Sequence, residues 1–345
     1  MDRRTFLRFG SCGVASLMLP DLALAQDFWV RSNDTALSVL EDKPLERIAF
    51  GSCNQSHLNQ KFWQLIGQDQ PDLWVWLGDN IYADNTTIEE RARRFTALKD
   101  NSYYKDFRQT VPILGTWDDH DFASNNMNGR FPEKAASKEA LLNFLDVGHD
   151  AKVWNHSGVY QSFRMGPPGR KTHLILLDLR FNMDTSWVDK KILGDDQWQW
   201  LQDELSSSDA DLIIIGSSLN VTSPLAGLGL EGWAGFPAER QKFYELLASV
   251  DAPIVLLSGD RHFAEITRIQ LGSGKPIHEV MSSGLTHANG VKLPHPGQVL
   301  TVVGHKNYGM LVIDWTLSGP QVRMQIRSAD RYGLLGQLAA NFQKN

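Results

Sequence analysis

Apolar runs of strand length recur along this chain, and loop-rich or helix-forming segments separate them. The runs are RIAFG (47–51), LWVWLG (73–78), VPILGTW (111–117), THLILLDLR (172–180), DLIIIGSS (211–218) and PIVLLSGD (253–260). Most of them are apolar at successive positions, which is typical of strands covered on both faces. Helices are predicted over residues 86–100, 137–147, 195–205 and 238–250. Strands that alternate with helices predict an α/β fold.

The C-terminal part of the chain predicts a β-hairpin and then a helix. YGMLVIDWTL and QVRMQIRSA flank turn residues at 318–320. Residues 328–345 are predicted to form a C-terminal helix packed on the core, or a lid over a site, because their apolar residues have roughly helical spacing. These residues are Leu334, Leu335, Leu338 and Phe342. The sequence has no internal repeat and no linker, so residues 26–345 are predicted to form a single domain.

The N-terminus has the pattern of a twin-arginine export signal. Arg3 and Arg4 precede a moderately apolar run that ends in Ala-Leu-Ala, which predicts cleavage after Ala25. The alternative is a short amphipathic helix with surface arginines. Export would use the twin-arginine (Tat) machinery and place the protein in the periplasm or outside the cell. The remaining sequence has no apolar run of the ~18 residues that a membrane span needs.

The charge of the chain excludes some classes of partner. Among 345 residues the formal net charge is −6. A general nucleic-acid binder needs a basic surface to neutralise phosphates, and a peripheral membrane protein often has a polybasic patch. The sequence predicts neither surface.

The cysteines raise a specific question. Cys12 lies inside the predicted signal, so the exported chain would keep only Cys53 and could form no internal disulfide. An unpaired thiol in an oxidising compartment needs burial or a bound partner. Cys53 is therefore either a small buried apolar residue or a ligand.

Polar groups capable of metal binding follow several of the predicted strands. The clusters are Ser52-Cys53-Asn54, Asp79-Asn80-Ile81-Tyr82, Asp118-Asp119-His120-Asp121 and Asp260-Arg261-His262. The carboxyl ends of the strands in an open α/β sheet share one edge, so these clusters are expected to converge. Each has a plainer alternative, because Asp79 and Asp260 could simply form turns and His262 could be a hydrogen-bonded core residue.

The segment TWDDHDF, residues 116–122, favours a metal site most strongly. Its three carboxylates repel one another and resist burial unless cations or hydrogen bonds compensate. Oxygen ligands such as Asp79 and Asp119 suit hard cations such as Ca²⁺. A thiolate at Cys53 and a phenolate at Tyr82 suit a more strongly polarising transition metal, for which Fe³⁺ is the plausible choice.

Other hydrolytic schemes fit the sequence less well. A cysteine phosphatase needs an arginine six residues after its cysteine, and that position here is Asn59. The sequence around Ser217 and Ser258 lacks the G-x-S-x-G elbow of serine hydrolases. The chain also has no G-x-x-x-x-G-K-[ST] phosphate loop.

Five motifs in order resemble the alkaline phosphatase D (PhoD-like) branch of the metallophosphoesterases. They are FGSCNQ, WLGDNIYAD, TWDDHDFASNN, LLDLR and LLSGDRHFAEI, and with NYG at 307–309 they extend over residues 48–309. The resemblance implies a hydrolase with a four-layer α/β sandwich of two mixed β-sheets flanked by helices. It also implies a metal site at the strand ends.

The resemblance assigns roles to individual residues. It makes Cys53, Asp79 and Tyr82 ligands of an iron-type site, with Asp79 bridging to a second cation, Ca²⁺ or another divalent ion. The other implied metal ligands are Asp118, Asp119, Asn125, Asp260 and His262. The implied catalytic residues are His120, Asp121 as the residue that orients it, and Arg180 as a phosphate clamp.

The chain departs from the family pattern in two places. About 20 residues separate the predicted signal from RIAFG, which is too few for the β-sandwich domain that usually precedes the metal domain. SSLN, residues 217–220, lacks the histidine that many metallophosphoesterases have after this strand, so Asn220 would have to replace it as an oxygen ligand.

The resulting hypothesis is an exported, metal-dependent phosphoesterase acting on phosphate monoesters, diesters or both. A hydroxide activated by the metals would attack phosphorus, and His120 would protonate the leaving alkoxide. Substrates would be small-molecule phosphate esters or phospholipids, selected by the loops at 219–237 and 284–309. Two alternatives stay open, a metallohydrolase acting on a lactone or another non-phosphate ester and a noncatalytic phosphate-ester binding protein.

Overall fold

The computed structural model of the chain describes residues 40–186, 190–225, 230–291 and 293–342. The predicted signal, residues 1–25, lies outside the described residues. The described residues fall in one compact unit, Ser32–Asn345. Among their helices, none is both long and apolar enough to cross a bilayer.

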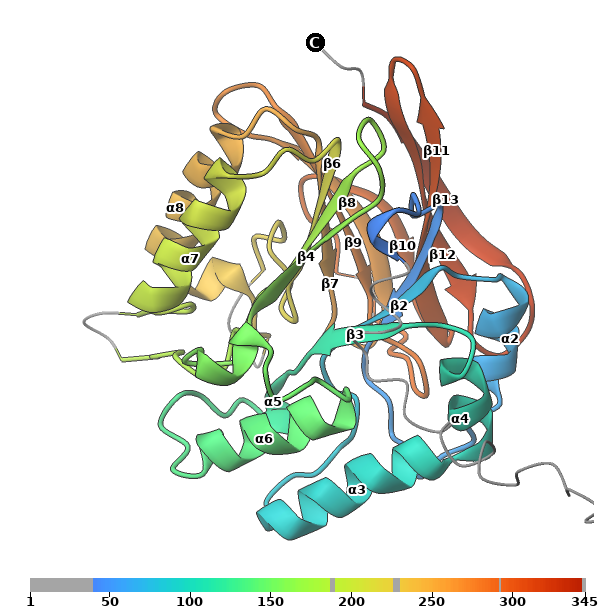
Figure 1. Cartoon of the computed structure of the whole chain (residues 1–345), viewed down its shortest axis with the longest axis vertical. Helices are drawn as coiled ribbons and strands as arrows, with labels where there is room; N and C mark the ends of the chain where they lie inside the picture. Colours follow the sequence, from blue (N-terminus) through green and yellow to red (C-terminus); the bar gives the residue numbers. More distant parts are fainter. Residues whose placement is uncertain (1–39, 187–189, 226–229, 292, 343–345) are drawn as a thin grey trace, which may run out of the picture. The chain divides into compact units, whose positions relative to one another are not determined.

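Two mixed β-sheets form the centre of the structure (Figure 1). The strands of the first sheet are β1 (Arg47–Gly51), β2 (Leu73–Leu77), β3 (Ile113–Thr116), β11 (Asn307–Thr316), β12 (Gly319–Ser328) and β13 (Leu334–Asn341). They lie in the order β13-β12-β11-β1-β2-β3, with β1, β2 and β3 parallel. The strands of the second sheet are β4 (Gln161–Met165), β5 (Thr172–Leu176), β6 (Leu212–Gly216), β7 (Ile254–Ser258), β8 (Ala264–Gln270), β9 (Pro276–Ser282) and β10 (Gln298–Val302). Their order is β10-β8-β9-β7-β6-β5-β4, with β5, β6, β7 and β9 parallel.

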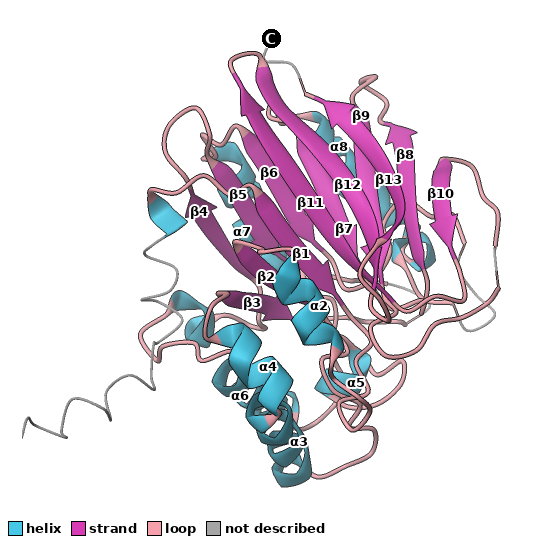
Figure 2. Cartoon of the chain, turned by 90° about the vertical axis from the view of Figure 1, so that its right-hand side faces the viewer, coloured by secondary structure: helices cyan, strands magenta, loops and turns pink. Residues whose placement is uncertain are grey.

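Helices cover the outer face of each sheet (Figures 1 and 2). The helices on the side of the first sheet are α2 (Phe62–Gln68), α3 (Ile88–Asp100), α4 (Ser102–Arg108) and α6 (Lys134–Phe144). Those on the side of the second sheet are α7 (Asp195–Ser206) and α8 (Pro237–Ala248). A third apolar core fills the space between the sheets. The predicted four-layer α/β sandwich of two mixed sheets is therefore confirmed.

Strand β2 explains why the predicted strands are apolar at every position. Trp74 and Trp76 point to the core beneath the helices, where Trp63 of α2 packs edge-on against both rings with centroids 4.9 and 5.3 Å away. Val75, between them in the sequence, points to the core between the two sheets. Successive side chains of a strand face opposite sides, so a strand with apolar layers on both sides must be apolar throughout.

The prediction of a C-terminal helix is wrong. Residues 334–341 form β13, which pairs antiparallel with β12. The register shifts where Ile326 pairs with Gly336 and Arg327 with Leu334, which leaves Leu335 as the extra residue of a bulge. The bulge separates Leu335 from Leu338 by three residues although both pack against the core between the sheets. The three-residue spacing of these apolar side chains is also the spacing expected of a helix. The strand is formed instead because the edge of β12 has backbone N–H and C=O groups that pair with β13, and a helix would leave them unpaired.

Candidate metal centre

Four turns at the ends of strands bring the predicted ligands together. Cys53, Asp79, Asp118 and Asp260 each lie two residues beyond the last residue of a strand, in β1, β2, β3 and β7 respectively. Since β1, β2 and β3 are parallel neighbours, their carboxyl ends share one edge of the first sheet. The predicted convergence of the polar clusters is found here, although β7, which carries the fourth cluster, belongs to the second sheet.

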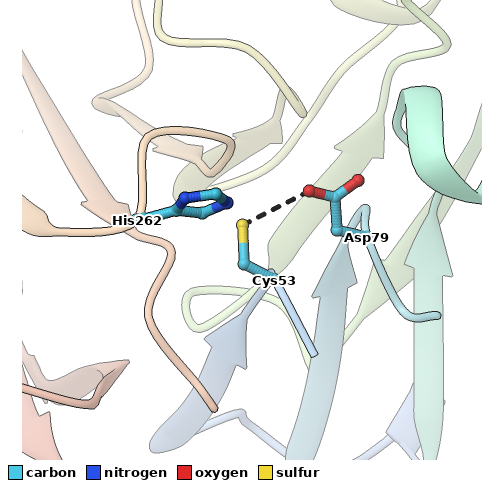
Figure 3. Close-up of side chains that lie close together, drawn as sticks. All are labelled: Cys53, Asp79 and His262. Atoms are coloured by element: carbon cyan, nitrogen blue, oxygen red, sulfur yellow. Dashed lines mark hydrogen bonds between the residues drawn. The ribbon is translucent and has the colours of Figure 1, made fainter. Parts of the chain in front are cut away.

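The first group of candidate ligands joins sulfur, oxygen and nitrogen atoms. Ligand atoms of Cys53, Asp79 and His262 all lie within 4.8 Å of one another. The Cys53 thiol donates to Asp79 Oδ2 at 3.4 Å, as Figure 3 shows, and His262 projects toward both from its own loop. The Tyr82 hydroxyl lies 3.3 Å from Asp79 Oδ2 and 3.0 Å from His262 Nε2. The structure therefore places the three predicted iron-type ligands in one cluster with the predicted metal ligand His262.

A second group overlaps the first at Asp79. Ligand atoms of Asp79, Asp119 and His120 also lie within 4.8 Å of one another. Asp119 is held by backbone N–H groups of His120 at 2.9 Å and Asn126 at 2.5 Å. Asp79 therefore belongs to both groups of candidate ligands.

The backbone of the centre is held in an unusual conformation. Four of the candidate ligands have φ in the left-handed region, at 61° for Cys53, 49° for Asp79, 77° for Asp260 and 58° for His262. This region costs a non-glycine residue roughly 1–2 kcal/mol. Tertiary hydrogen bonds stabilise the turns, including Asn54 N–H to the Asp79 carbonyl at 2.8 Å. Such outliers concentrate at functional sites, which supports a role for this edge beyond packing.

The electrostatics of the centre call for a cation. Burial raises the pKa of Asp79 well above its usual value, and the carboxylates of Asp119 and Asp118 raise it further. Burial and the Asp79 carboxylate likewise raise the pKa of the Cys53 thiol. Within the described part of the chain, Asp79 Oδ1 and Asp118 Oδ2 are buried without a hydrogen-bond partner. A buried acceptor without a donor is costly, so these residues fit a bound metal ion that would coordinate and neutralise them.

His262 is suited to metal binding in its neutral form. Burial lowers the pKa of His262 to about 4, and the imidazoles of His287 and His120 act in the same direction. A neutral imidazole presents a lone pair, which is what a metal ion requires. For Tyr82, burial and the neighbouring Cys53 and Asp79 raise the pKa well above its usual value, so a phenolate at this position would depend on a bound cation.

His120 is oriented by Asp84, and the predicted role of Asp121 is wrong. Nδ1 of His120 lies 2.7 and 2.8 Å from the two carboxylate oxygens of Asp84. Asp121 instead accepts from the backbone N–H groups of Ile81 at 3.0 Å and Asp118 at 3.1 Å, which fixes the turns after β2 and β3. Asp84 was missed although it is the last residue of the motif WLGDNIYAD. The spacing between Asp79 and Asp84 does not predict a contact of Asp84 with His120, because the turn that brings the two side chains together is irregular.

The position of Arg180 speaks against the predicted phosphate clamp. The guanidinium is fully buried, with Nε 2.5 Å from Asp118 Oδ1 and Nη2 2.8 Å from Glu231 Oε2. Its remaining nitrogen donates to the Met127 carbonyl at 3.3 Å. Burial raises the pKa of Asp118 to about 6, against the opposing effect of Arg180. The arrangement makes Arg180 a support for the turn that carries Asp118.

The other predicted ligands differ in how far they are buried. Burial raises the pKa of Asp260 well above its usual value, and the carboxylates of Asp118 and Asp119 raise it further. Asn125 is exposed, and its backbone N–H donates to Asp84 at 2.8 Å. Asn220 is fully buried and its Oδ1 accepts from Ser223 N–H at 2.8 Å, so this oxygen is used within its own loop.

The structure adds His287, which the sequence did not single out. Its Nε2 lies 3.2 Å from the Tyr82 hydroxyl, and its ring centroid lies 4.2 Å from that of His262. The residue belongs to the region 284–309, whose composition predicted a functional loop. Only the tertiary structure shows that this part of the loop reaches the centre.

Comparison with known proteins identifies the family to which the chain belongs. The sequence profile described as PhoD-like phosphatase matches residues 48–301, most of the chain. The chain belongs to the PhoD-like phosphatase family. The resemblance predicted from the motifs is thereby confirmed. Alkaline phosphatase D of Bacillus subtilis (strain 168) is 24% identical over 290 residues, which cover 70% of this chain and 50% of that protein. The chain thus spans about half the length of this PhoD-like relative.

Solved structures share the fold of this PhoD-like chain. The structure of PhoD superposes with a TM-score of 0.69 at 19% identity, covering 87% of this chain and 69% of the other. Purple acid phosphatase PPD1 from yellow lupin (Lupinus luteus) seeds gives 0.57 at 12% identity, covering 86% and 53%. GAP50, described as the anchor in the inner membrane complex of Plasmodium, gives 0.54 at 14% identity, covering 88% and 90%. The chain therefore shares its α/β sandwich fold with these three structures.

Proposed function

We propose that this protein is a metal-dependent phosphoesterase that hydrolyses phosphate monoesters, diesters or both. The observation that carries the proposal is the pair of candidate ligand groups that share Asp79, the second of which includes His120. Membership of the PhoD-like phosphatase family gives independent support. The fold alone would be weaker support, because folds host many functions and one structural relative is described as an anchor.

We propose Fe³⁺ for the group of Cys53, Asp79, Tyr82 and His262, whose sulfur, phenol and imidazole atoms suit a polarising transition metal. Asp79 and Asp119, with Asp118 and Asp260 nearby, would hold Ca²⁺ or another divalent cation through oxygen atoms. Bound cations of this kind supply a nucleophile derived from water at neutral pH and neutralise phosphoryl oxygens.

In this proposal, His120 protonates the leaving alkoxide. Asp84 accepts from Nδ1–H of His120, so the opposite ring nitrogen is the one available to the substrate. The Asp84 carboxylate also stabilises the imidazolium that donates the proton. Arg180 contributes by holding Asp118 in place, and Asp121 does so by fixing the turns that carry Asp79 and Asp119.

We propose that the protein is exported through the twin-arginine machinery, on the basis of Arg3, Arg4 and the Ala25 cleavage site. Export of a folded protein would let a metal occupy Cys53 before the thiol met an oxidising compartment. Replacement of both arginines by lysine should retain the protein in the cytoplasm, which cell fractionation would reveal. Periplasmic accumulation of the R3K/R4K variant would contradict the proposal.

A metal-resolved activity profile tests the proposed function. Protein stripped of metal would be reloaded with Fe³⁺, Ca²⁺ or both, and assayed with an aryl phosphate monoester, a phosphodiester including a phospholipid, and a lactone. We expect hydrolysis of phosphate esters only in metal-loaded protein. Turnover of the lactone alone would favour the non-phosphate hydrolase, and tight phosphate-ester binding without turnover would favour a binding protein. Elemental analysis that found no metal in the active protein would refute the ligand assignment.

A further inference from the structure

The segment after β9 carries two polar side chains that approach the centre from outside the ligand groups. Thr286 is buried and His287 is half-buried, and they follow Leu285, whose backbone N–H donates to the Ser52 carbonyl at 3.4 Å. Neither residue is needed for the hydrolytic mechanism proposed above. Their contacts nevertheless join two turns that come from different strands.

Thr286 ties down the turn that carries Cys53. Its hydroxyl donates to the Cys53 carbonyl at 3.1 Å and accepts from the Gln55 N–H at 2.8 Å. Cys53 has a left-handed φ of 61°, which its neighbours must stabilise. The Thr286 hydroxyl therefore helps to hold the thiol-bearing turn in its strained conformation.

His287 continues the chain of hydrogen bonds to Tyr82. Its Nδ1 lies 3.2 Å from the Thr286 hydroxyl and its Nε2 lies 3.2 Å from the Tyr82 hydroxyl. The centroid of the Tyr82 ring lies 4.2 Å from that of His120 and 5.4 Å from that of His287. Both nitrogens of His287 thus have partners, which favours a supporting role over direct contact with a metal ion or a substrate.

We propose that Thr286 and His287 form a clasp that sets the position of the Tyr82 hydroxyl relative to Cys53. The clasp joins the turn of Cys53, through the Thr286 hydroxyl and the His287 ring, to the Tyr82 oxygen. When Tyr82 is a phenolate, His287 Nε2–H donates to it and Nδ1 accepts from the Thr286 hydroxyl, which still accepts from the Gln55 N–H of the Cys53 turn. Both residues are positioning residues for the metal centre. The inference rests on the proposed metal site and extends it, since partners of this kind orient ligands and tune the affinity for the metal.

The alternative is that His287 only packs against its neighbours. The two cases differ in what happens to the Tyr82 oxygen when the imidazole is removed. A merely packed ring would leave a phenolate–Fe³⁺ contact unchanged. If His287 is part of a clasp, removal of its imidazole would let the phenol ring turn, which would weaken the phenolate–Fe³⁺ contact.

The experiment uses the full chain, stripped of metal and reloaded with Fe³⁺ alone. The readouts are the iron affinity and the visible charge-transfer absorption of an iron-bound phenolate, neither of which requires turnover. The Tyr82→Phe variant identifies the absorption band by removing it. We expect His287→Ala to shift or weaken the band and to lower iron affinity by about 10-fold. His287→Gln, whose amide can still bond the phenol oxygen, should recover most of both signals.

Two further variants keep the test decisive if His287→Ala folds poorly. Thr286→Val removes the hydroxyl at nearly constant shape and should change the band in the same direction, while Thr286→Ser should restore it. His295→Ala is the matched control, because His295 is a buried histidine of the same region whose Nε2 contacts Glu265 at 3.1 Å instead of the centre. The control should lose stability and keep the band.

The outcomes separate the clasp from the proposed function. An unchanged band and unchanged iron affinity in both His287→Ala and Thr286→Val would overturn the clasp while leaving ester hydrolysis intact. Absence of the band in the unsubstituted iron-loaded protein would also overturn it, because Tyr82 would then not be a ligand. If the unsubstituted protein shows the band and hydrolyses no phosphate ester, the proposed function fails and the variants still decide the clasp.

Discussion

Asp84 holds His120 through both carboxylate oxygens, at 2.7 and 2.8 Å from Nδ1 of the imidazole. The same carboxylate accepts from the Asn125 N–H at 2.8 Å, so the turn after α5 (Asp119–Phe122) fixes it in turn. The contact places the proton of Nδ1 toward Asp84 and leaves Nε2 of His120 available to the substrate. Substitution of Asp84 should therefore affect catalysis through His120.

We expect His120→Ala to lower kcat by ~10²-fold or more and Asp84→Asn to lower it by at least ~10-fold. An asparagine in place of Asp84 keeps the shape but removes the charge that stabilises the imidazolium. Steady-state kinetics of the single and double variants measure this, with metal content as the control. If the two residues act as a unit, the double variant should be no slower than His120→Ala alone. Additive losses would contradict the assignment.

Cys53→Ser should lower iron content and activity together. Serine is nearly isosteric, so packing changes little, but its hydroxyl is a much poorer ligand than a thiolate for a transition metal. Elemental analysis and turnover of the same sample provide the measurement. A merely buried cysteine would lose little of either, and full iron content in the variant would rule out ligation by Cys53.

Arg180→Met should destabilise the fold. Removal of the guanidinium leaves the buried Asp118 carboxylate without its ion-pair partner, and breaking a buried pair in this way typically costs about 3 kcal/mol or more. Chemical denaturation would show the loss in the free energy of unfolding. Glu231→Gln, at the more exposed end of the same network, is the matched control and should cost less. A variant with unchanged stability and a strongly raised KM would restore the phosphate-clamp role.

Acid should destabilise the protein through His278, which lies far from the ligand turns at the start of β9. Burial and the neighbouring Arg268 together lower the pKa of His278 to about 4. The unfolded chain, with a pKa of about 6.5, then binds more protons between these values. The stability contributed by this site is therefore complete above pH 6.5 and is lost as the pH falls toward 4.

Measurement of unfolding at several pH values checks this expectation. We expect the loss in the free energy of unfolding between pH 7.5 and 5.5 to be smaller by about 1 kcal/mol in His278→Leu than in the unsubstituted protein. The variant His57→Leu, at an exposed position, is the control for loss of a histidine. Parallel pH profiles for His278→Leu and the unsubstituted protein would refute the prediction.

Much of the fold was predictable because burial on both faces leaves a direct trace in the sequence. The central strands β1, β2, β6 and β7 were predicted within one or two residues of their bounds, since an apolar run in this setting has few other uses. The strands β4, β8, β9, β10 and β13 were missed. They alternate, carry polar residues such as Glu265 and Glu279, or contain a bulge.

Some residues of the candidate site were likewise predictable from the sequence, and others were not. The sequence by itself determined that Cys53, Asp79, Tyr82, Asp119 and His262 are candidate ligands, because metal-binding groups that directly follow buried strands are expected at the carboxyl ends of those strands, where ligands bind. Only the tertiary structure decided that Asp84 orients His120, that Arg180 is enclosed by Asp118 and Glu231, and that His287 reaches Tyr82. These contacts depend on how irregular turns place side chains across long sequence separations, and local sequence patterns carry no record of that geometry.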